Sequence, residues 1–133
     1  SQRTNREGVD ALRGFASELG LSTHALELRA GLHLKSACSL ADASTLLVVE
    51  GAFRLVDLPV LAVEVLKVSE AAGANVLALG DRVLVSAAAP RTAELLASRG
   101  LRPITLELSQ IHAGDGALSC LSLRVAPPGH WAV

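Results

Sequence analysis

The feature that most constrains the fold is a helix followed by a glycine, a leucine and an extended segment, an order that occurs twice. The first copy spans Asn5–Leu28 with Gly20 at the helix end, and the second spans Pro90–Leu108 with Gly100 at the same place. Glycine is the preferred residue just after a helix end. Repeats of about forty residues are typical of arrays and propellers, whose units bury their apolar faces against one another. We therefore expect an α/β protein built from repeated units.

A predicted hairpin precedes the second copy. Val76–Leu79 and Val83–Val85 are apolar runs separated by Gly80-Asp81-Arg82, a pattern typical of a tight turn between antiparallel strands. Residues 76–108 therefore predict a strand–strand–helix–strand unit. The remaining expectations are a capping box at Thr4–Glu7, strands at Leu32–Leu40, Thr45–Glu50 and Val63–Val68, an undecided segment at Phe53–Ala62, and a strand that begins near Cys120.

One domain with a core of its own is expected, since the chain has 133 residues, half of them apolar. We place this domain at residues 1–126 and a C-terminal tail at 127–133. Two units plus fragments are too few to close a ring, and the chain contains no Met. Both observations favour a part of a longer chain. Its partner would then be the missing N-terminal half of the same protein, or a second copy of this chain.

Composition argues against several classes of protein. The net charge is −1 with scattered cations, and the aromatic residues number only three, so a nucleic-acid surface is not expected. The apolar stretches are too short to cross a bilayer, so no membrane is expected either. Two cysteines are too few for a secreted disulfide framework, which favours the cytoplasm. Four His and two Cys without zinc-site spacing predict no metal.

Cys120 and His33 are the residues from which chemistry is expected. A cysteine and a histidine far apart in sequence can meet across a sheet, as in thiol enzymes. The ordinary interpretations are a buried, inert cysteine and a core histidine with satisfied hydrogen bonds, and a disulfide between Cys120 and Cys38 is disfavoured. By default, Arg3 is a solvated cation and Asp115 part of a turn. The further candidate bases are His24, His112 and His130.

Several sequence blocks resemble those of the dimethylarginine dimethylaminohydrolases, in the same order. They are Ser1–Asn5, Leu32–Ser36 (LHLKS), Ala74-Asn75, Pro90–Thr92 and Asp115–Leu123, which contains SCLSL. The match runs over nearly the whole chain, to about Arg124, and LHLKS and SCLSL are its specific parts. The chain thus resembles the C-terminal half of these enzymes. Arginine deiminases share the His and Cys with different flanking residues and are the runner-up.

The resemblance implies a five-fold pseudo-symmetric α/β propeller, the pentein fold. It implies hydrolysis of asymmetric dimethylarginine or monomethylarginine to citrulline and an alkylamine, without a cofactor. Cys120 would be the nucleophile and His33 the general acid and base. Arg3 would bind the amino-acid end of the substrate, with Gly114, through its backbone, and Asp115 as further contacts. Other members tend to carry a larger residue at the position of Gly114.

Two different functions stay open at this point: an arginine deiminase-like amidinohydrolase, and a non-catalytic half-propeller that binds a partner chain. In the family that the chain resembles, the acids that face the guanidinium come chiefly from the N-terminal half. A buried guanidinium is costly to desolvate without carboxylates. We therefore expect this chain alone to be inactive.

Overall fold

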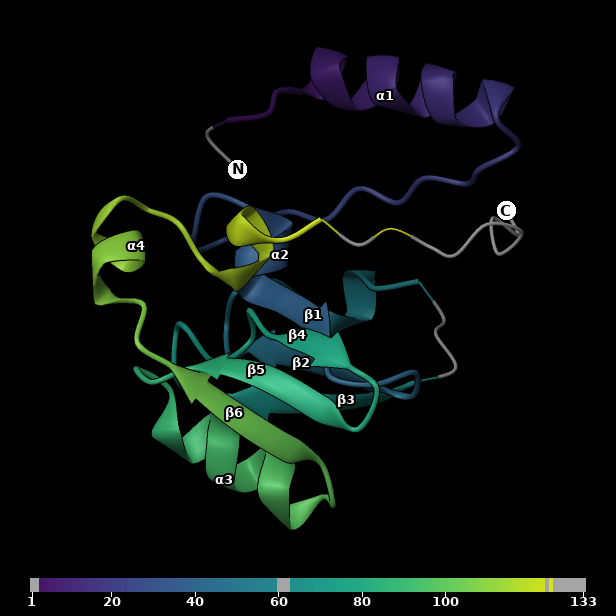
Figure 1. Ribbon diagram of the computed structural model, residues 1–133. Helices are drawn as coiled ribbons and strands as arrows, with labels where there is room; N and C mark the ends of the chain where they lie inside the picture. Colours follow the sequence, from purple (N-terminus) through teal and green to yellow (C-terminus); the bar gives the residue numbers. More distant parts are fainter. Residues whose placement is uncertain (1–2, 60–62, 124, 126–133) are drawn as a thin grey trace.

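The computed structural model describes residues 3–59, 63–123 and 125 (Figure 1). The predicted tail at 127–133 lies outside the described residues. The elements, with 3-10 helices labelled η, are α1 (Arg6–Glu18), α2 (Leu34–Ala37), β1 (Cys38–Leu40), β2 (Thr45–Val49), η1 (Leu55–Asp57), β3 (Glu64–Val68), β4 (Leu77–Leu79), β5 (Arg82–Ser86), α3 (Pro90–Ser98), β6 (Arg102–Leu106), α4 (Ser109–Ala113) and η2 (Leu118–Leu121).

The strands form two three-stranded sheets with the same topology, β1-β2-β3 and β4-β5-β6. In each sheet the first pair is antiparallel and the second is parallel. The predicted strand–strand–helix–strand unit at residues 76–108 is confirmed as β4, β5, α3 and β6. Residues 38–68 form a second unit of this kind, in which η1 takes the place of the helix. The repeated α/β architecture is therefore present, in a different pair of segments from the one that the sequence pattern indicated.

In the first predicted copy of the helix–strand repeat, Asn5–Leu28, the helix is confirmed but the strand is wrong. Helix α1 forms, but the described residues 21–28 contain no strand. A strand requires a neighbour that supplies ladder hydrogen bonds. Within the described part of the chain, the backbone hydrogen bond that follows this segment runs from the Arg29 N–H to the Ala52 carbonyl at 2.8 Å. The capping box is also displaced, since the N-cap of α1 is Asn5, which accepts from the Gly8 N–H, rather than Thr4.

The main core joins the two sheets. Leu47 of β2, Val83 and Val85 of β5, and Leu96 of α3 are fully buried in a single cluster. A second cluster lies on the other face of β2, where Leu46 and Val48 pack with other buried residues: Ala37, Ala52 and Phe53. Because successive residues of a strand point to opposite faces, β2 contributes to both clusters. The main core therefore packs the β1-β2-β3 sheet against the unit formed by β4, β5, α3 and β6.

Helix α1 lies apart from both sheets (Figure 1). The side chains of Leu12 and Phe15, and of the C-cap residue Leu19, are 64%, 66% and 69% exposed, although their spacing marks them as the apolar face of the helix. None of the described helices is long and apolar enough to cross a membrane.

Candidate active site

His33 lies at the start of α2, as its N-cap residue, with extended backbone and no capping hydrogen bond from its side chain. The predicted strand at Leu32–Leu40 is therefore only partly correct: its first half is the helical turn α2 and its end is β1. The imidazole is exposed and lines a pocket of about 280 Å³. Because a core histidine would be buried and hydrogen-bonded, the ordinary interpretation of His33 is wrong.

Asp115 lines the same pocket, in the turn between α4 and η2. Its φ of 57° lies in the left-handed region, which aspartate tolerates better than most residues. A Cβ on the next residue, Gly116, would lie 2.8 Å from Ile111 Cγ2, so any larger residue there would force Ile111 or the turn to shift. A Cβ on Gly114 would meet only the Ile111 carbonyl oxygen at 3.6 Å, which leaves room for a larger residue.

Cys120 lies in η2 and is exposed. The predicted strand near this residue is wrong, because residues 118–121 form a 3-10 turn whose buried anchor is Leu118. Leu121 and Leu123, which give the segment its alternating pattern, are 59% and 89% exposed. Since the thiol is exposed, the interpretation of Cys120 as a buried, inert cysteine is also wrong. Cys120 is not among the residues that line the pocket of His33 and Asp115.

Asn75 connects the segments that carry His33 and Cys120. Its Nδ2 donates to the Lys35 carbonyl of α2 and to the Ser119 Oγ of η2, each at 2.8 Å. The Ser119 N–H donates back to Asn75 Oδ1 at 3.0 Å. Asn75 is only 4% exposed. The sequence by itself indicates no such role for Asn75, since its partners lie 40 and 44 positions away.

His112, one of the candidate bases in the sequence, is engaged elsewhere. Its Nδ1 lies 3.0 Å from the Gly116 carbonyl oxygen and its Nε2 lies 2.8 Å from the Ser86 Oγ. A carbonyl only accepts, so Nδ1 carries a proton and donates to Gly116, while Nε2 shares a hydrogen bond with the Ser86 hydroxyl. His112 therefore fixes the turn that contains Asp115. Of the remaining candidate histidines, His24 is exposed and His130 lies outside the described residues.

Both cysteines are free thiols. Cys38 begins β1 and is half-buried, and burial raises the pKa of its thiol above the ordinary value. A buried thiol with a raised pKa is a poorer nucleophile at neutral pH. Of the two, Cys120 is the one open to a substrate.

Arg3 lies in the turn before α1 and is exposed. It is not among the residues that line the pocket of His33 and Asp115. Within the described part of the chain, no cluster of three or more His, Cys, Asp or Glu side chains could hold a metal ion.

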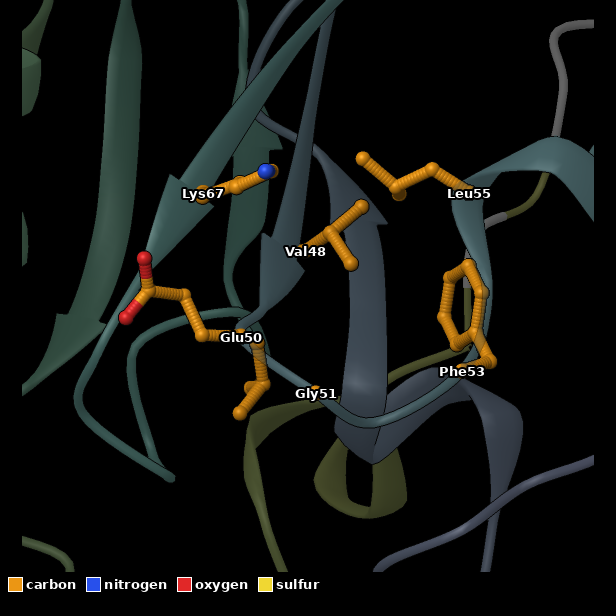
Figure 2. A pocket seen from close by; sticks show the side chains of 7 residues that line it. Val48, Glu50, Gly51, Phe53, Leu55 and Lys67 are labelled. Carbon is orange, nitrogen blue, oxygen red and sulfur yellow. The ribbon is translucent and has the colours of Figure 1, made fainter.

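A second pocket, of about 350 Å³, lies at the C-terminal end of β2. Figure 2 shows Glu50 and Lys67 on one side of it, and Phe53 and Leu55 on the other, with Val48 between them. Neither His33, Asp115 nor Cys120 lines this pocket.

In fold, the chain is similar to a solved amidinotransferase. An amidinotransferase of the saxitoxin biosynthetic pathway from Microseira wollei superimposes with a TM-score of 0.80, over 95% of this chain and 42% of the other. Its 23% identity shows a common fold alone. No protein-family model matches the chain.

In sequence, the chain is similar to dimethylarginine dimethylaminohydrolases. The enzyme of Streptomyces coelicolor is 39% identical over 124 residues, which cover 92% of this chain and 47% of that protein. The Pseudomonas aeruginosa enzyme, solved as a cysteine-to-serine mutant with citrulline, superimposes with a TM-score of 0.76 at 30% identity, over 92% of this chain and 48% of that one. The resemblance inferred from the sequence blocks is confirmed. The chain spans about half the length of these relatives.

Proposed function

We propose that this chain supplies the nucleophile and the acid/base residue of an enzyme that hydrolyses methylated arginine to citrulline and an alkylamine. The observation that carries the proposal is the exposure of Cys120 and His33 on two segments, η2 and α2, that Asn75 connects. The 39% identity to a dimethylarginine dimethylaminohydrolase supports the substrate class. The citrulline bound to the Pseudomonas aeruginosa relative is the product that this reaction would form.

The chemistry of the guanidinium explains why a thiolate is needed. Its carbon is part of a delocalised cation and resists neutral nucleophiles, so the Cys120 thiolate attacks it and forms a tetrahedral adduct. His33, as imidazolium, protonates the departing alkylamine, and the carbon–nitrogen bond breaks to leave an S-alkylthiouronium on Cys120. His33, now neutral, takes a proton from an attacking water. The carbon–sulfur bond then breaks, which releases citrulline and restores the thiolate.

The pocket of His33 explains why this chain would not act alone. Asp115 is the only carboxylate among the described residues that line it. Moving a guanidinium out of water costs several kcal/mol of solvation free energy. Carboxylates that face the guanidinium offset this cost. One acid balances the charge but does not orient a planar group with several N–H donors. Further carboxylates would come from a second half of the enzyme.

The surface of the chain supports such a second half. The chain spans 47% of the Streptomyces coelicolor relative, and Leu12, Phe15 and Leu19 of α1 are exposed. Apolar faces of repeat units are covered by neighbouring units. The two described units would thus belong to a five-fold propeller, completed by a second half of similar size that packs on α1.

The test is release of citrulline from asymmetric dimethylarginine. Three samples are compared: the 133-residue chain, the part of the Streptomyces coelicolor relative that this chain does not match, and a fusion of the two through a flexible linker. The fusion should turn over and each half should not. Robust activity of the 133-residue chain would show that the acids come from this chain or its dimer.

Two further measurements test the competing functions. Arginine offered in place of dimethylarginine tests the arginine deiminase reaction, which would release ammonia. An amidine-bearing electrophile tests the non-catalytic function, because it should alkylate Cys120 of an active site faster than an uncharged electrophile does. An inactive fusion whose Cys120 shows no such preference would overturn the proposed function.

A further inference from the structure

The side-chain amide of Asn75 makes three hydrogen bonds to two elements that are distant in sequence. Both Nδ2 hydrogens are used, one by the Lys35 carbonyl and one by the Ser119 Oγ. The Oδ1 atom accepts from the Ser119 backbone N–H. In Figure 1 the yellow turn that contains η2 lies beside α2. Asn75 therefore holds together the two segments that carry His33 and Cys120.

The partners determine which atom of the amide is oxygen and which is nitrogen. The Lys35 carbonyl can only accept, and the Ser119 backbone N–H can only donate. The nitrogen of the side-chain amide must thus donate and its oxygen must accept. Asn75 is itself only 4% exposed. Aspartate, of the same shape, would set a carboxylate oxygen against the Lys35 carbonyl. Leucine would remove the partner of both the Lys35 carbonyl and the Ser119 N–H, in bonds that are partly buried, and the loss of such bonds is costly.

The backbone around Asn75 is itself fixed from β1. The Ser39 Oγ donates to the Ala74 carbonyl and accepts from the Val76 N–H at 3.0 Å. Ser39 lies in β1, the strand that follows α2 directly in the chain. The backbone on both sides of Asn75 is thus bonded to β1, which fixes the point from which the Asn75 side chain reaches α2.

Among the described residues, the other contacts of η2 constrain its position less closely than Asn75 does. Within η2 the Cys120 N–H bonds the Ala117 carbonyl at 3.0 Å, and Leu118 is its buried anchor. The first contact is local and the second is apolar and non-directional. The two hydrogen bonds between Asn75 and Ser119 are directional contacts from η2 to the segment before β4.

We propose that Asn75 is a positioning residue, which sets the Cys120 thiol relative to His33 and the substrate carbon without touching the substrate. This inference rests on the proposed function, in which both groups act on one carbon. A displacement of a reacting group by about 1 Å can cost on the order of a hundredfold in rate. The effect should therefore appear in kcat more than in KM, because substrate is gripped chiefly by other residues.

The test compares Asn75→Asp and Asn75→Leu with Thr92→Val in the active fusion. Thr92 is a matched control, because it is 2% exposed and its side chain and backbone donate to the Glu70 carboxylate. Thr92 does not line the pocket of His33 and Asp115. The Asn75 variants should lower kcat by on the order of tenfold to a hundredfold with a much smaller change in KM. Thr92→Val should reduce stability without this loss of kcat, measured well below each unfolding midpoint.

Ser119→Ala provides a graded variant. It removes the Oγ acceptor but keeps the Ser119 N–H bond to Asn75 Oδ1, so its kcat should lie between those of the parent and Asn75→Asp. Equal kcat for the Asn75 variants and Thr92→Val at similar stability would overturn the positioning role.

A second measurement keeps this inference separate from the proposed function. Cys120 is alkylated by iodoacetamide in the 133-residue chain with Cys38→Ser, and hydrogen exchange of residues 117–122 is followed in the same samples. Asn75→Asp should change the Cys120 alkylation rate several-fold and speed exchange in η2, while Thr92→Val changes neither. No change in either quantity would overturn the positioning role even where the fusion is inactive. An active Cys120→Ser fusion would overturn the proposed function instead.

Discussion

Glu70 caps helix α3 from a position that is distant in sequence. Its Oε2 accepts from the Thr92 N–H at 2.7 Å and from the Thr92 Oγ1 at 2.8 Å, and its Oε1 accepts from the Arg91 N–H at 3.1 Å. The residue at the N-cap position itself, Ala89, has no side-chain acceptor. Glu70 thus supplies, across 22 positions, the acceptor that a local Ser or Asp usually provides.

Glu70→Gln should destabilise the chain by about 1 kcal/mol at pH 7, the usual cost of a lost helix cap. Denaturant unfolding measures this free energy. Glu64→Gln is the control, because its ion pair with Arg99 is exposed and exposed pairs contribute little. A cost no larger than that of Glu64→Gln would mean that the cap is not important.

The stability contributed by Glu70 should depend on pH. Burial alone would raise the pKa of Glu70, but hydrogen bonds from Thr92 and Arg91 and the charge of Arg91 outweigh it, so the pKa is lowered. A carboxyl with a lowered folded-state pKa stabilises above its unfolded pKa of about 4.3 and loses that contribution as the pH falls. The free energy of unfolding should therefore decrease more steeply below about pH 5 for the parent than for Glu70→Gln. If the free energy of unfolding changed with pH in the same way for the parent and for Glu70→Gln, this prediction would be wrong.

Cys120→Ser should lower turnover of the fusion by on the order of a thousandfold or more, because one imidazole does not generate an alkoxide at neutral pH. Cys38→Ser is the matched control, since Cys38 is half-buried with a raised pKa, and it should leave turnover near that of the parent. Citrulline release measures both. An active Cys120→Ser enzyme together with an inactive Cys38→Ser enzyme would reverse the assignment.

His33→Ala should lower kcat by on the order of a hundredfold or more, the usual scale for a positioned acid and base. The covalent adduct on Cys120 should accumulate, since its hydrolysis needs an activated water. Mass spectrometry of the quenched enzyme detects it. His24→Ala, which changes another exposed histidine, should show neither effect. An unmodified Cys120 with unchanged turnover would exclude His33 from the reaction.

Gly116→Ala should destabilise the chain by about 1–3 kcal/mol, the usual cost of an overpacked site, because its Cβ would lie 2.8 Å from Ile111 Cγ2 and 3.1 Å from the Ile111 carbonyl oxygen. Gly114→Ala should be close to neutral, with its one neighbour at 3.6 Å. Thermal unfolding compares the two. Equal midpoints would show that the turn before η2 adjusts freely.

The sequence alone determined the elements with strong local signals. The hairpin around Gly80, the helix from Pro90 and the strand after Gly100 form as the local pattern predicts, because turn residues, helix caps and apolar alternation act over a few residues. The matching blocks were also enough to indicate the kind of relative, and they contain both Cys120 and His33. A resemblance of this kind depends on which residues occur and in which order, and the sequence states both directly.

Only the tertiary structure decided how these residues are arranged. The segment after Gly20 looked like a strand but lacks a ladder partner among the described residues, and the second repeat unit became visible only through its pairing, β1 with β2 and β2 with β3. Asn75 is one polar residue in the sequence, yet its amide joins α2 to η2. Glu70 likewise caps a helix that begins 20 residues after it. Hydrogen bonds of this kind depend on distances between atoms, and local sequence does not contain those distances.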